Sequence, residues 1–327
     1  MSPPLKLWVA GARPRTLPAA VVPVVVGTAA GYLSSGRFVL TTPQISSGCH
    51  ATVCTGFDRQ LSWLNAVLAL VVALGIQIGT NYVNDYADGV RGTDEHRVGP
   101  IRLVAGKLAT VREVKIAALM AFGVAGLAGL VLAARVTWWF IPLGIVCGLA
   151  GWAYTGGPKP YGYLGFGELF VFVFFGLVAT AGSAYVQHAP FVISVGRQLF
   201  SYSYDWWFVL WAGVPVGLLA AALLQANNLR DIATDTESGK KTLAVRLGRR
   251  RAGLFFCFTL MGVALSVGIL YSYRPWSLLA LLAVPLAAGP LRLALSDREG
   301  RALLPMLGTT ARLQLLTGLL LTIGLLL

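Results

Sequence analysis

Long apolar segments recur along the whole chain and constrain its fold more than any other feature. Hydrophobic residues make up 56% of the 327 residues and charged residues only 12%, about half the charge of an ordinary soluble domain. A helix that spans a bilayer needs about 20 mostly apolar residues. The segments that satisfy this requirement lie near residues 16–34, 63–84, 113–134, 137–154, 164–185, 206–227, 252–271, 276–294 and 306–326. We therefore expect an all-α, polytopic membrane protein in which about nine transmembrane helices form a single domain over residues 1–327.

The distribution of Lys and Arg predicts how the chain is oriented. The first apolar segment contains Pro18 and Pro23 and is too long for a cleavable signal peptide. If the N-terminus is cytoplasmic, the cytoplasmic side holds 21 of the 26 Lys and Arg residues and the outer side holds five. Cytoplasmic loops carry such an excess. We expect the N-terminus inside and the C-terminus outside, and the net charge of +13 then requires no nucleic acid partner.

Two long outer loops follow from this orientation. Residues 35–62 are rich in Ser, Thr and Gly, and residues 186–205 are aromatic and polar. Neither loop contains a readable chemical motif. Cys49 and Cys54 share the first loop, and they either form a disulfide in an oxidising exterior, remain unlinked, or bind a metal together with His50.

The acidic residues are few and unevenly placed. Seven of the 13 fall in two short segments, within the predicted cytoplasmic loops 85–112 and 228–250. They are Asp85, Asp88, Asp94 and Glu95 after the second span, and Asp231, Asp235 and Glu237 after the sixth. Such clustering on one membrane face indicates a functional site, because ionisable residues near a membrane are costly and are usually functional.

The two acidic segments are alike in sequence. NYVNDYADGVRGTDEHRVGP and NNLRDIATDTESGKKTLAVRLG each begin with Asn at the end of an apolar span and place Asp four residues later. The matched trios are Asn81, Asp85 and Asp88 in the first segment and Asn227, Asp231 and Asp235 in the second. If the helices extend that far, the first trio spans an arc of about 60° and the second an arc of about 80°. Each trio is then expected to point in one direction.

Both clusters sit at predicted helix C-termini, where the helix macrodipole disfavours negative charge. Mutual repulsion between carboxylates adds to this cost. A divalent cation offsets both effects, and Mg²⁺ prefers carboxylates together with substrate phosphates. The alternative is a pair of solvated loops in which the acids simply pair with neighbouring Arg and Lys side chains.

Cationic side chains are interleaved with these acids. They are Arg91, Arg97, Arg102, Lys107, Arg230, Lys240 and Lys241. Mg²⁺ flanked by Arg and Lys is how proteins hold a polyphosphate and stabilise it as a leaving group. The chain has no Walker-type GxxxxGK[ST] sequence, so a nucleotide is not implied. For any single cation, the cytoplasmic excess of positive charge remains an equally good explanation.

Two further cytoplasmic segments carry candidate residues. YTGGPKPYGYLGFGE runs from Tyr154 to Glu168, and Lys159 is its sole cation. Its Tyr and Gly residues suit a tight turn beside a cavity, where aromatic faces can steady an allylic cation. Glu168 begins an apolar span and either faces the pocket or reaches toward the membrane surface. Arg13 and Arg15, before the first span, bind a substrate carboxylate or diphosphate, or anchor at lipid headgroups.

Together these motifs resemble the UbiA superfamily of intramembrane aromatic prenyltransferases. NDYADGVRGTDEHRVGPIRLV, YTGGPKPYGYLGFGE and NNLRDIATDTESGKKTLAVRLG are similar to its menaquinone-pathway branch, the 1,4-dihydroxy-2-naphthoate polyprenyltransferases, and ARPRTLP fits the same branch. The resemblance covers the whole chain. The matching positions are Asn84, Asp85 and Asp88 in the first family motif, NDxxDxxxD, and Asp231 and Asp235 in the second, DxxxD. Gly92 stands at the last position of the first motif, which leaves the next acid, Asp94, as the least secure ligand.

The resemblance implies a fold and a reaction. Helices would surround a central cavity that is capped by the cytoplasmic loops and opens laterally to membrane lipid, in the inner (plasma) membrane of a bacterial cell. A polyprenyl diphosphate would ionise, and the allylic cation would be attacked by 1,4-dihydroxy-2-naphthoate. Loss of CO₂ and diphosphate would give demethylmenaquinone. Two Mg²⁺ ions are expected to bridge the diphosphate.

The same resemblance, with the residue analysis above, supplies the candidate site. Catalytic roles are expected for Asp85, Asp88, Asp231, Asp235, Lys159 and Tyr154. The expected metal ligands are Asp85, Asp88, Asp94, Asp231 and Asp235. Substrate contacts are expected from Asn81, Asn84, Arg97, Arg102, Lys107, Asn227, Asn228, Arg230, Lys240 and Arg15.

Other functions are also compatible with parts of this pattern. A related prenyltransferase would act on another aromatic acceptor, such as 4-hydroxybenzoate, homogentisate, haem or chlorophyllide. A divalent-cation transporter would use the acids as an ion site, but it would place them at the bilayer midplane within broken helices. A phospholipid headgroup transferase would require a DGxxAR sequence, which the chain lacks. Prenyl chain length, oligomeric state and any general base are not encoded in a pattern that we can read.

Overall fold

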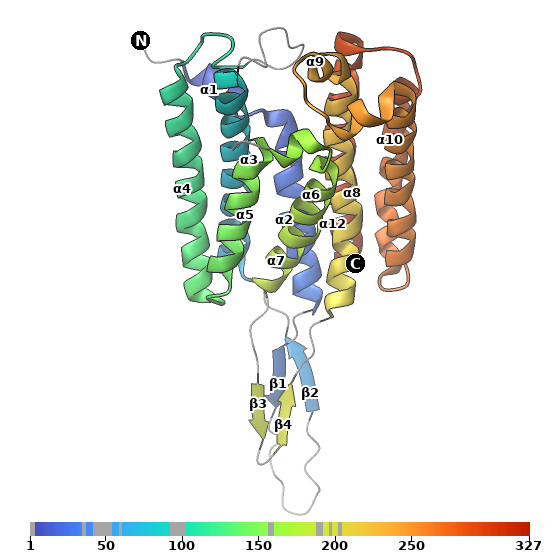
Figure 1. The fold of residues 1–327 in the computed structure, drawn as a ribbon. Coiled ribbons are helices and arrows are strands. Elements are labelled where there is room, and N and C mark those ends of the chain that lie inside the picture. The colour runs from blue at the N-terminus through green and yellow to red at the C-terminus, as the bar shows by residue number, and fades with distance from the viewer. Residues whose placement is uncertain are drawn as a thin grey trace, which may run out of the picture.

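A computed structural model shows a bundle of long helices with two small strand pairs at one end (Figure 1). The residues that the structure describes are 4–34, 37–41, 54–58, 61–91, 102–155, 160–187, 192–195, 198–201 and 205–327. The candidate Cys49–Cys54 disulfide and the candidate metal site with His50 lie outside the described residues and side chains.

The bundle is formed by helical segments that run back and forth between its two ends (Figure 1). They are α2 (Pro18–Ser34), α3 (Trp63–Arg91), α4 (Val111–Arg135), α5 (Phe140–Thr155), the continuous α6 (Gly167–Val171), η3 (Phe172–Val178) and α7 (Ala179–Tyr185), α8 (Trp206–Arg230), α10 (Leu243–Leu270), η4 (Pro275–Ala287) with α11 (Ala288–Ala294), and α12 (Leu304–Leu326). Each predicted apolar segment is therefore helical.

The number of membrane spans differs from the number of helical segments. Among the described residues, seven helices are long and apolar enough to cross a membrane. The segment Leu5–Thr16 and α2 meet at a bend of 56°, and they make an eighth span if they count as one. The apolar part of α5, Phe140–Tyr154, is shorter than a full span. The chain is thus a multi-pass membrane protein, but the predicted count of nine is not confirmed.

Short helices close the end of the bundle that carries the N-terminus (Figure 1). They are α1 (Leu5–Gly11), η1 (Pro14–Thr16), η2 (Tyr161–Leu164), α9 (Ile232–Glu237) and η5 (Gly300–Leu303). At the same end α3 continues to Arg91 and α8 to Arg230. Of the acids predicted to lie in loops, Asp85 and Asp88 lie on the last turns of α3, because this helix extends past its apolar stretch. Asp231 caps α8, and Asp235 and Glu237 lie on α9. Asp94 and Glu95 lie outside the described residues.

Strands occur at the opposite end, where the sequence predicted only loops. β1 (Arg37–Thr41) pairs antiparallel with β2 (Cys54–Asp58), and β3 (Val192–Val195) pairs antiparallel with β4 (Gln198–Ser201). Both pairs project beyond the helices (Figure 1). Pairing satisfies backbone N–H and C=O groups in loops that are otherwise long. The transmembrane part remains all-α.

Exposed tryptophans mark one membrane boundary. Six of the seven among the described residues stand at the start or end of helices near the strand pairs, and Trp152, near the end of α5, is the exception. The six are Trp63, Trp138, Trp139, Trp206, Trp207 and Trp276. Trp is enriched where a membrane meets water, because its ring is apolar and its N–H is polar. The strand pairs are therefore placed outside the bilayer, and the acidic helix ends lie at the other surface.

Burial is uneven across the bundle. In α8, 67% of the apolar window is buried inside the protein, against 22% in α3 and 28% in α4. Around α8 pack α10 and α12, with side chains such as Phe256 and Met306 fully buried between them. α8 is the most buried of the long helices, whereas α4 carries many exposed apolar side chains and α3 turns part of its apolar surface toward an internal cavity.

The helices α2 and α7 approach each other backbone to backbone. A Cβ atom at Gly27 would lie 2.3 Å from the carbonyl oxygen of Thr180, and one at Gly31 would lie 2.2 Å from that of Ala184. Small residues permit such close approach between membrane helices. This contact holds α7 in place. It also fixes α6 and η3, which directly precede α7 in the same continuous helical segment.

Replacing Gly31 with Ala should force α2 and α7 apart and destabilise the bundle. We expect the apparent Tm in detergent to fall by about 3 to 10 °C. Gly268→Ala is the matched control, because a Cβ there has no atom within 4 Å. Equal Tm values for the two variants would contradict this account of the packing.

Candidate active site

A large cavity combines a polar end with a long apolar wall. Its volume is about 1080 Å³, and most of its surface comes from apolar side chains such as Leu130, Ile145 and Phe175. The predicted site residues that line it are Arg15, Asn81, Asn84, Asp88, Arg102, Tyr154, Asn227, Asn228, Arg230, Asp231, Asp235 and Lys240. Residues from distant parts of the sequence thus meet at one end of an otherwise apolar space.

Asp88 is the meeting point of this polar end. It lies near the end of α3 and is only 3% exposed. Arg102 Nη2 and Lys240 Nζ each lie 3.3 Å from one of its carboxylate oxygens, and the Tyr163 hydroxyl donates to Oδ1. The Lys240 ammonium also lies 4.8 Å from the centre of the Tyr163 ring. Asp88 therefore ties α3 to the segments around Arg102, η2 and Lys240.

The second acidic motif is arranged differently. The guanidinium of Arg230 donates from Nε and Nη2 to the two oxygens of Asp231, at 2.7 Å each. Asp235 lies on α9, and its Oδ1 is 4.0 Å from Lys240 Nζ. The backbone N–H of Lys240 also donates to the Asp235 carbonyl oxygen at 2.8 Å. Lys240 consequently stands between Asp88 of the first motif and Asp235 of the second.

Asp85 does not line the cavity, in contrast to Asp88, Asp231 and Asp235. The α3 residues that do line it near this end are Gln77, Thr80, Asn81, Asn84 and Asp88. At about 100° per residue, the centre of this stripe lies about 85° around the helix from Asp85. The sequence grouped Asp85 with Asn81 and Asp88, because the three also share an arc, but the cavity lies on the other side of that arc.

The carboxylate of Asp85 binds backbone instead. It is 1% exposed, and it accepts hydrogen bonds from the N–H groups of Leu103 at 2.7 Å and Val104 at 3.3 Å. Leu103 is fully buried against Tyr82 and neighbouring side chains. Asp85 thereby holds in place the segment whose first described residue, Arg102, reaches Asp88. A role as metal ligand stays a prediction for Asp85.

The remaining predicted residues fall outside the cavity or outside the described chain. Lys107 has a positive φ of 55° and is exposed on a turn, where its backbone N–H donates to Val104. It is not among the lining residues. Asp94, Arg97 and Lys159 lie outside the described residues, so their roles stay predictions.

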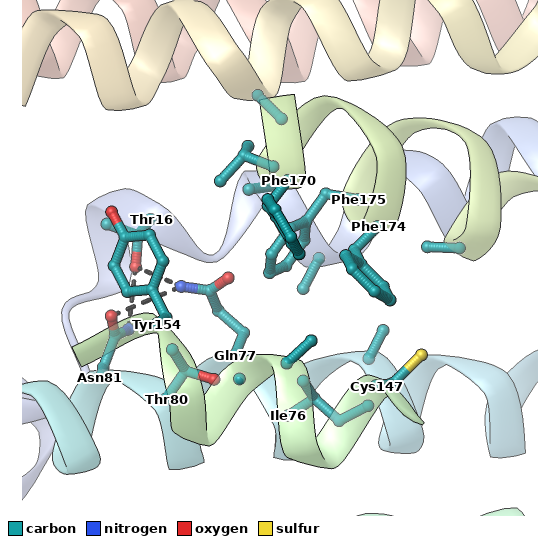
Figure 2. A pocket seen from close by; sticks show the side chains of 18 of the residues that line it. Thr16, Ile76, Gln77, Thr80, Asn81, Cys147, Tyr154, Phe170, Phe174 and Phe175 are labelled. Atoms are coloured by element: carbon teal, nitrogen blue, oxygen red, sulfur yellow. Dashed lines mark hydrogen bonds between the residues drawn. The ribbon is translucent and has the colours of Figure 1, made fainter. Parts of the chain in front are cut away.

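The N-terminal segment joins the site through hydrogen bonds to α3 (Figure 2). The Asn81 amide donates to the Ala12 carbonyl oxygen at 2.9 Å and to the Thr16 hydroxyl at 3.0 Å. Gln77 donates to Thr16 at 3.2 Å. Arg13, between these contacts, has a left-handed backbone with φ 54° and lines the cavity. Gln77 went unnoticed in the sequence, although its spacing from Asn81 and Asp88 was a detectable signal.

Glu168 contributes indirectly. It is 6% exposed and does not line the cavity. Its Oε1 accepts a hydrogen bond from the Asn228 amide at 2.8 Å. Neither of the two alternatives that the sequence left open is therefore correct, because the side chain is buried and orients Asn228, which does line the cavity.

Aromatic rings form one wall beside the polar end. Tyr154 and Tyr161 pack edge to face with ring centres 5.5 Å apart, and Tyr161 stacks on Phe170 at 4.0 Å. Phe170 in turn stacks on Phe174 at 5.9 Å. Burial raises the pKa of the Tyr161 hydroxyl, so it stays protonated and donates to the Ala150 carbonyl oxygen at 2.8 Å.

The polar end has donors suited to an anion. Nη2 of Arg13 and Nη1 of Arg230 are buried and have no hydrogen-bond partner among the described residues. Both residues line the cavity. Buried N–H groups without an acceptor are costly, and charged guanidinium groups form strong paired hydrogen bonds to phosphate oxygens. An anionic ligand at this end would satisfy both groups.

The acids also fit a metal that is bound together with such an anion. No three His, Cys, Asp or Glu side chains of the described chain come together as a metal cage. Mg²⁺, however, is usually held by one or two carboxylates plus substrate phosphates and water. The same cavity is lined by Asp88 on α3, by Asp231, which directly precedes α9, and by Asp235 within α9. These three residues supply carboxylates to it. The donor set therefore suits Mg²⁺ with a diphosphate.

Comparisons with known proteins agree with this arrangement. Residues 47–324 match the family model described as UbiA prenyltransferase family. The 1,4-dihydroxy-2-naphthoate octaprenyltransferase of Mycobacterium tuberculosis is 45% identical, over 93% of this chain and 91% of its own. The enzyme of the same name from Escherichia coli is 35% identical, over 97% of this chain and 94% of its own.

The fold has solved counterparts. A UbiA homolog from Archaeoglobus fulgidus, bound to GPP and Mg²⁺, matches with a TM-score of 0.55 at 15% identity, over 96% of this chain and 99% of that one. An apo UbiA homolog from Aeropyrum pernix K1 matches with a TM-score of 0.56 at 16% identity, over 93% of this chain and 96% of that one. At such identities the likeness concerns the fold.

Replacing Asp85 with Asn should loosen the segment around Leu103 without removing a cavity-lining carboxylate. Hydrogen bonds to a charged group contribute about 1.5–3 kcal/mol. We therefore expect trypsin to cleave after the exposed Lys107 about 10- to 100-fold faster than in the unaltered protein. Asp297→Asn, at an exposed carboxylate elsewhere, is the control. Mass spectrometry of the fragments identifies the cut, and an unchanged rate would assign Asp85 a different role.

Proposed function

The chain belongs to the UbiA prenyltransferase family, and on that premise we propose that it transfers a polyprenyl group from a polyprenyl diphosphate to 1,4-dihydroxy-2-naphthoate. Two relatives named 1,4-dihydroxy-2-naphthoate octaprenyltransferase match this chain over most of their own length. The observation that carries the proposal is the cavity itself. Buried guanidinium groups and carboxylates stand at one end of an apolar space of about 1080 Å³, which suits a diphosphate with a long hydrocarbon tail.

The diphosphate binds at the polar end. Arg13 and Arg230 offer the N–H groups that lack an acceptor among the described residues. Arg102 and Lys240 lie beside them on Asp88. These cations neutralise the negative charge that builds up on the diphosphate as its bond to the prenyl carbon breaks. The prenyl chain extends along the apolar wall, where its hydrocarbon surface is removed from water.

Mg²⁺ is proposed as the cofactor, held by Asp88, Asp231 and Asp235 together with the diphosphate. Two ions are proposed, one for each acidic motif, with amide oxygens from Asn84, Asn227 or Asn228 as further ligands. Bound Mg²⁺ supplies positive charge that stabilises the leaving diphosphate. The Archaeoglobus fulgidus homolog binds Mg²⁺ together with GPP, which supports the same pairing here.

Aromatic side chains protect the reacting carbon. When the carbon–oxygen bond breaks, the electron pair leaves with the diphosphate and an allylic cation remains. Faces of rings such as Tyr154 and Phe170 stabilise a cation without attacking it. The surrounding apolar wall excludes water, which would otherwise trap the cation as an alcohol.

The acceptor ring then forms the new carbon–carbon bond. Its carboxyl group leaves as CO₂, and the electron pair of the broken bond returns to the ring. No net oxidation occurs in this step, so the product is the quinol form of demethylmenaquinone. Because CO₂ departs in place of a ring proton, we assign no side chain as a strong general base at that carbon.

The orientation proposed from charge places the acidic end in the cytoplasm. The N-terminus, the acidic helix ends and most of the Lys and Arg residues share that end, and the strand pairs and C-terminus lie outside. The charged diphosphate group and the acceptor are thereby bound from the cytoplasm of a bacterial cell. The acids stand at helix ends rather than in mid-span, which favours the enzyme over a cation transporter.

The choice of acceptor is tested directly with purified protein in lipid nanodiscs. Labelled prenyl diphosphate is offered with 1,4-dihydroxy-2-naphthoate, 4-hydroxybenzoate or homogentisate, with Mg²⁺ or with EDTA. We expect a prenylated product and an equal amount of released CO₂ with the naphthoate and Mg²⁺ alone. Preference for another acceptor, or full turnover in EDTA, would overturn the proposal.

Asp231→Asn and Asp88→Asn should each lower kcat/KM by about 100-fold or more, because each removes a charge that holds the metal–diphosphate complex. The protein should still fold, since the amide keeps the shape of the carboxylate. Asp205→Asn, at an exposed helix cap near the other end, is the control. Activity close to that of the unaltered enzyme in Asp231→Asn would remove Asp231 from the site.

A further inference from the structure

Gln77 stands about one helical turn along α3 from Asn81 and about three turns from Asp88, on the side of the apolar part of the cavity. It lies on α3, is 7% exposed and lines the cavity. In Figure 2 its side chain reaches toward Thr16 and Asn81 at one side and toward open space below Phe170 at the other.

Hydrogen bonds determine which end of the Gln77 amide faces the cavity. The carbonyl oxygens of Ala12 and Arg13 can only accept. Asn81 Nδ2 donates to Ala12 at 2.9 Å, so the other amide atom of Asn81 is the oxygen. The Thr16 hydroxyl donates to Arg13 at 2.9 Å, so toward its other neighbours it accepts.

Gln77 therefore meets two acceptors. Its Nε2 lies 3.2 Å from Thr16 Oγ1 and 3.4 Å from Asn81 Oδ1. The amide must direct its NH₂ group toward both, because the reverse orientation would place two oxygens against each other. The carbonyl oxygen Oε1 is consequently turned away from this network and toward the cavity (Figure 2).

A flat aromatic surface lies across that space. Phe170 and Phe174 stack with their planes 20° apart, and Tyr161 extends the stack at 26°. Figure 2 shows Phe170 and Phe174 on one side of the opening and Gln77 with Ile76 on the other. A planar bicyclic ring can lie against the Phe side chains while one edge meets the Gln77 oxygen.

We propose that Gln77 Oε1 binds a ring hydroxyl of the aromatic acceptor and so positions the acceptor for attack. The inference rests on the proposed function. A carbonyl oxygen accepts but cannot donate, so this contact selects for a hydroxyl. It also draws the hydroxyl proton away from the ring oxygen, which makes the ring richer in electrons. The oxidised quinone presents a carbonyl in the same place and is repelled.

The first test compares the unaltered enzyme with Gln77→Met, which keeps the length of the side chain and removes the amide. We expect the KM for 1,4-dihydroxy-2-naphthoate to rise about 5-fold, the size of one neutral hydrogen bond. The KM for prenyl diphosphate should stay within about 2-fold. Isothermal titration of the acceptor alone, without Mg²⁺ or prenyl diphosphate, should show the same loss of affinity.

A second variant, Thr16→Val, distinguishes two effects of Gln77→Met. One is loss of the proposed contact between Gln77 Oε1 and the acceptor hydroxyl, and the other is loss of the hydrogen bond between Gln77 and Thr16. Thr16→Val removes the hydrogen bond that joins Gln77 to Thr16, as Gln77→Met also does, but it keeps the Gln77 carbonyl. The contact of Asn81 with Ala12 is kept in both variants. Each variant is offered 1-hydroxy-2-naphthoate and 4-hydroxy-2-naphthoate, which lack one hydroxyl or the other. In the unaltered enzyme and Thr16→Val, one analogue should bind about 5-fold more weakly than the diol, and in Gln77→Met the difference should vanish.

The outcomes separate this inference from the proposed function. If the unaltered enzyme prenylates the diol but Gln77→Met discriminates the analogues as before, Gln77 does not bind the hydroxyl. Equal affinity of the unaltered enzyme for the diol and its quinone would also overturn the inference. Failure of the unaltered enzyme to use the diol at all would instead refute the proposed function.

Discussion

Buried carboxylates at the end of an apolar bundle are the constraint on which the rest of the structure depends. Burying an unpaired charge is costly, so each acid must be met by cations or by N–H donors. Asp88 is met by two cations, Asp231 by the neighbouring guanidinium of Arg230, and Asp85 by backbone N–H groups. The polar end is therefore held together by charge balance, whereas the remainder of the bundle is held by apolar packing.

This balance joins parts of the chain that are far apart in sequence. Asp88 and Lys240 are separated by 152 residues and meet at 3.3 Å. The backbone of the Lys240 segment also bonds to η2, where the Lys241 N–H donates to Tyr163 at 2.9 Å. A substrate that binds the same charges would exchange partners with these ion pairs. Within the chain these ion pairs balance the charge of Asp88, and the proposed diphosphate and metal would compete for the same groups.

Hydropathy was sufficient to predict the helical segments, because a membrane leaves few alternatives for a long apolar stretch. It could not predict that α3 and α8 continue past their apolar parts to carry Asp88 and the Arg230–Asp231 pair. Motif spacing identified most of the cavity-lining polar residues. It did not indicate that the Asp85 carboxylate accepts hydrogen bonds from backbone N–H groups, since that depends on how α3 packs. It also missed Gln77 and the part played by Glu168, whose partners include residues on other segments. Backbone pairing of β1 with β2 and of β3 with β4 left no recognisable signal in the two outer loops.

The hydrogen bonds that join the N-terminal segment to α3 have a consequence for synthesis of the chain. Ala12 and Thr16 leave the ribosome early, but their partners Asn81 and Gln77 follow 61 to 69 residues later. Chains fold from the N-terminus as they are made. These hydrogen bonds can therefore form only after α3 has been made, so the first segment is synthesised well before it is held in place. The binding end of the cavity is complete only when Asp231, Asp235 and Lys240, which are made later still, have joined it.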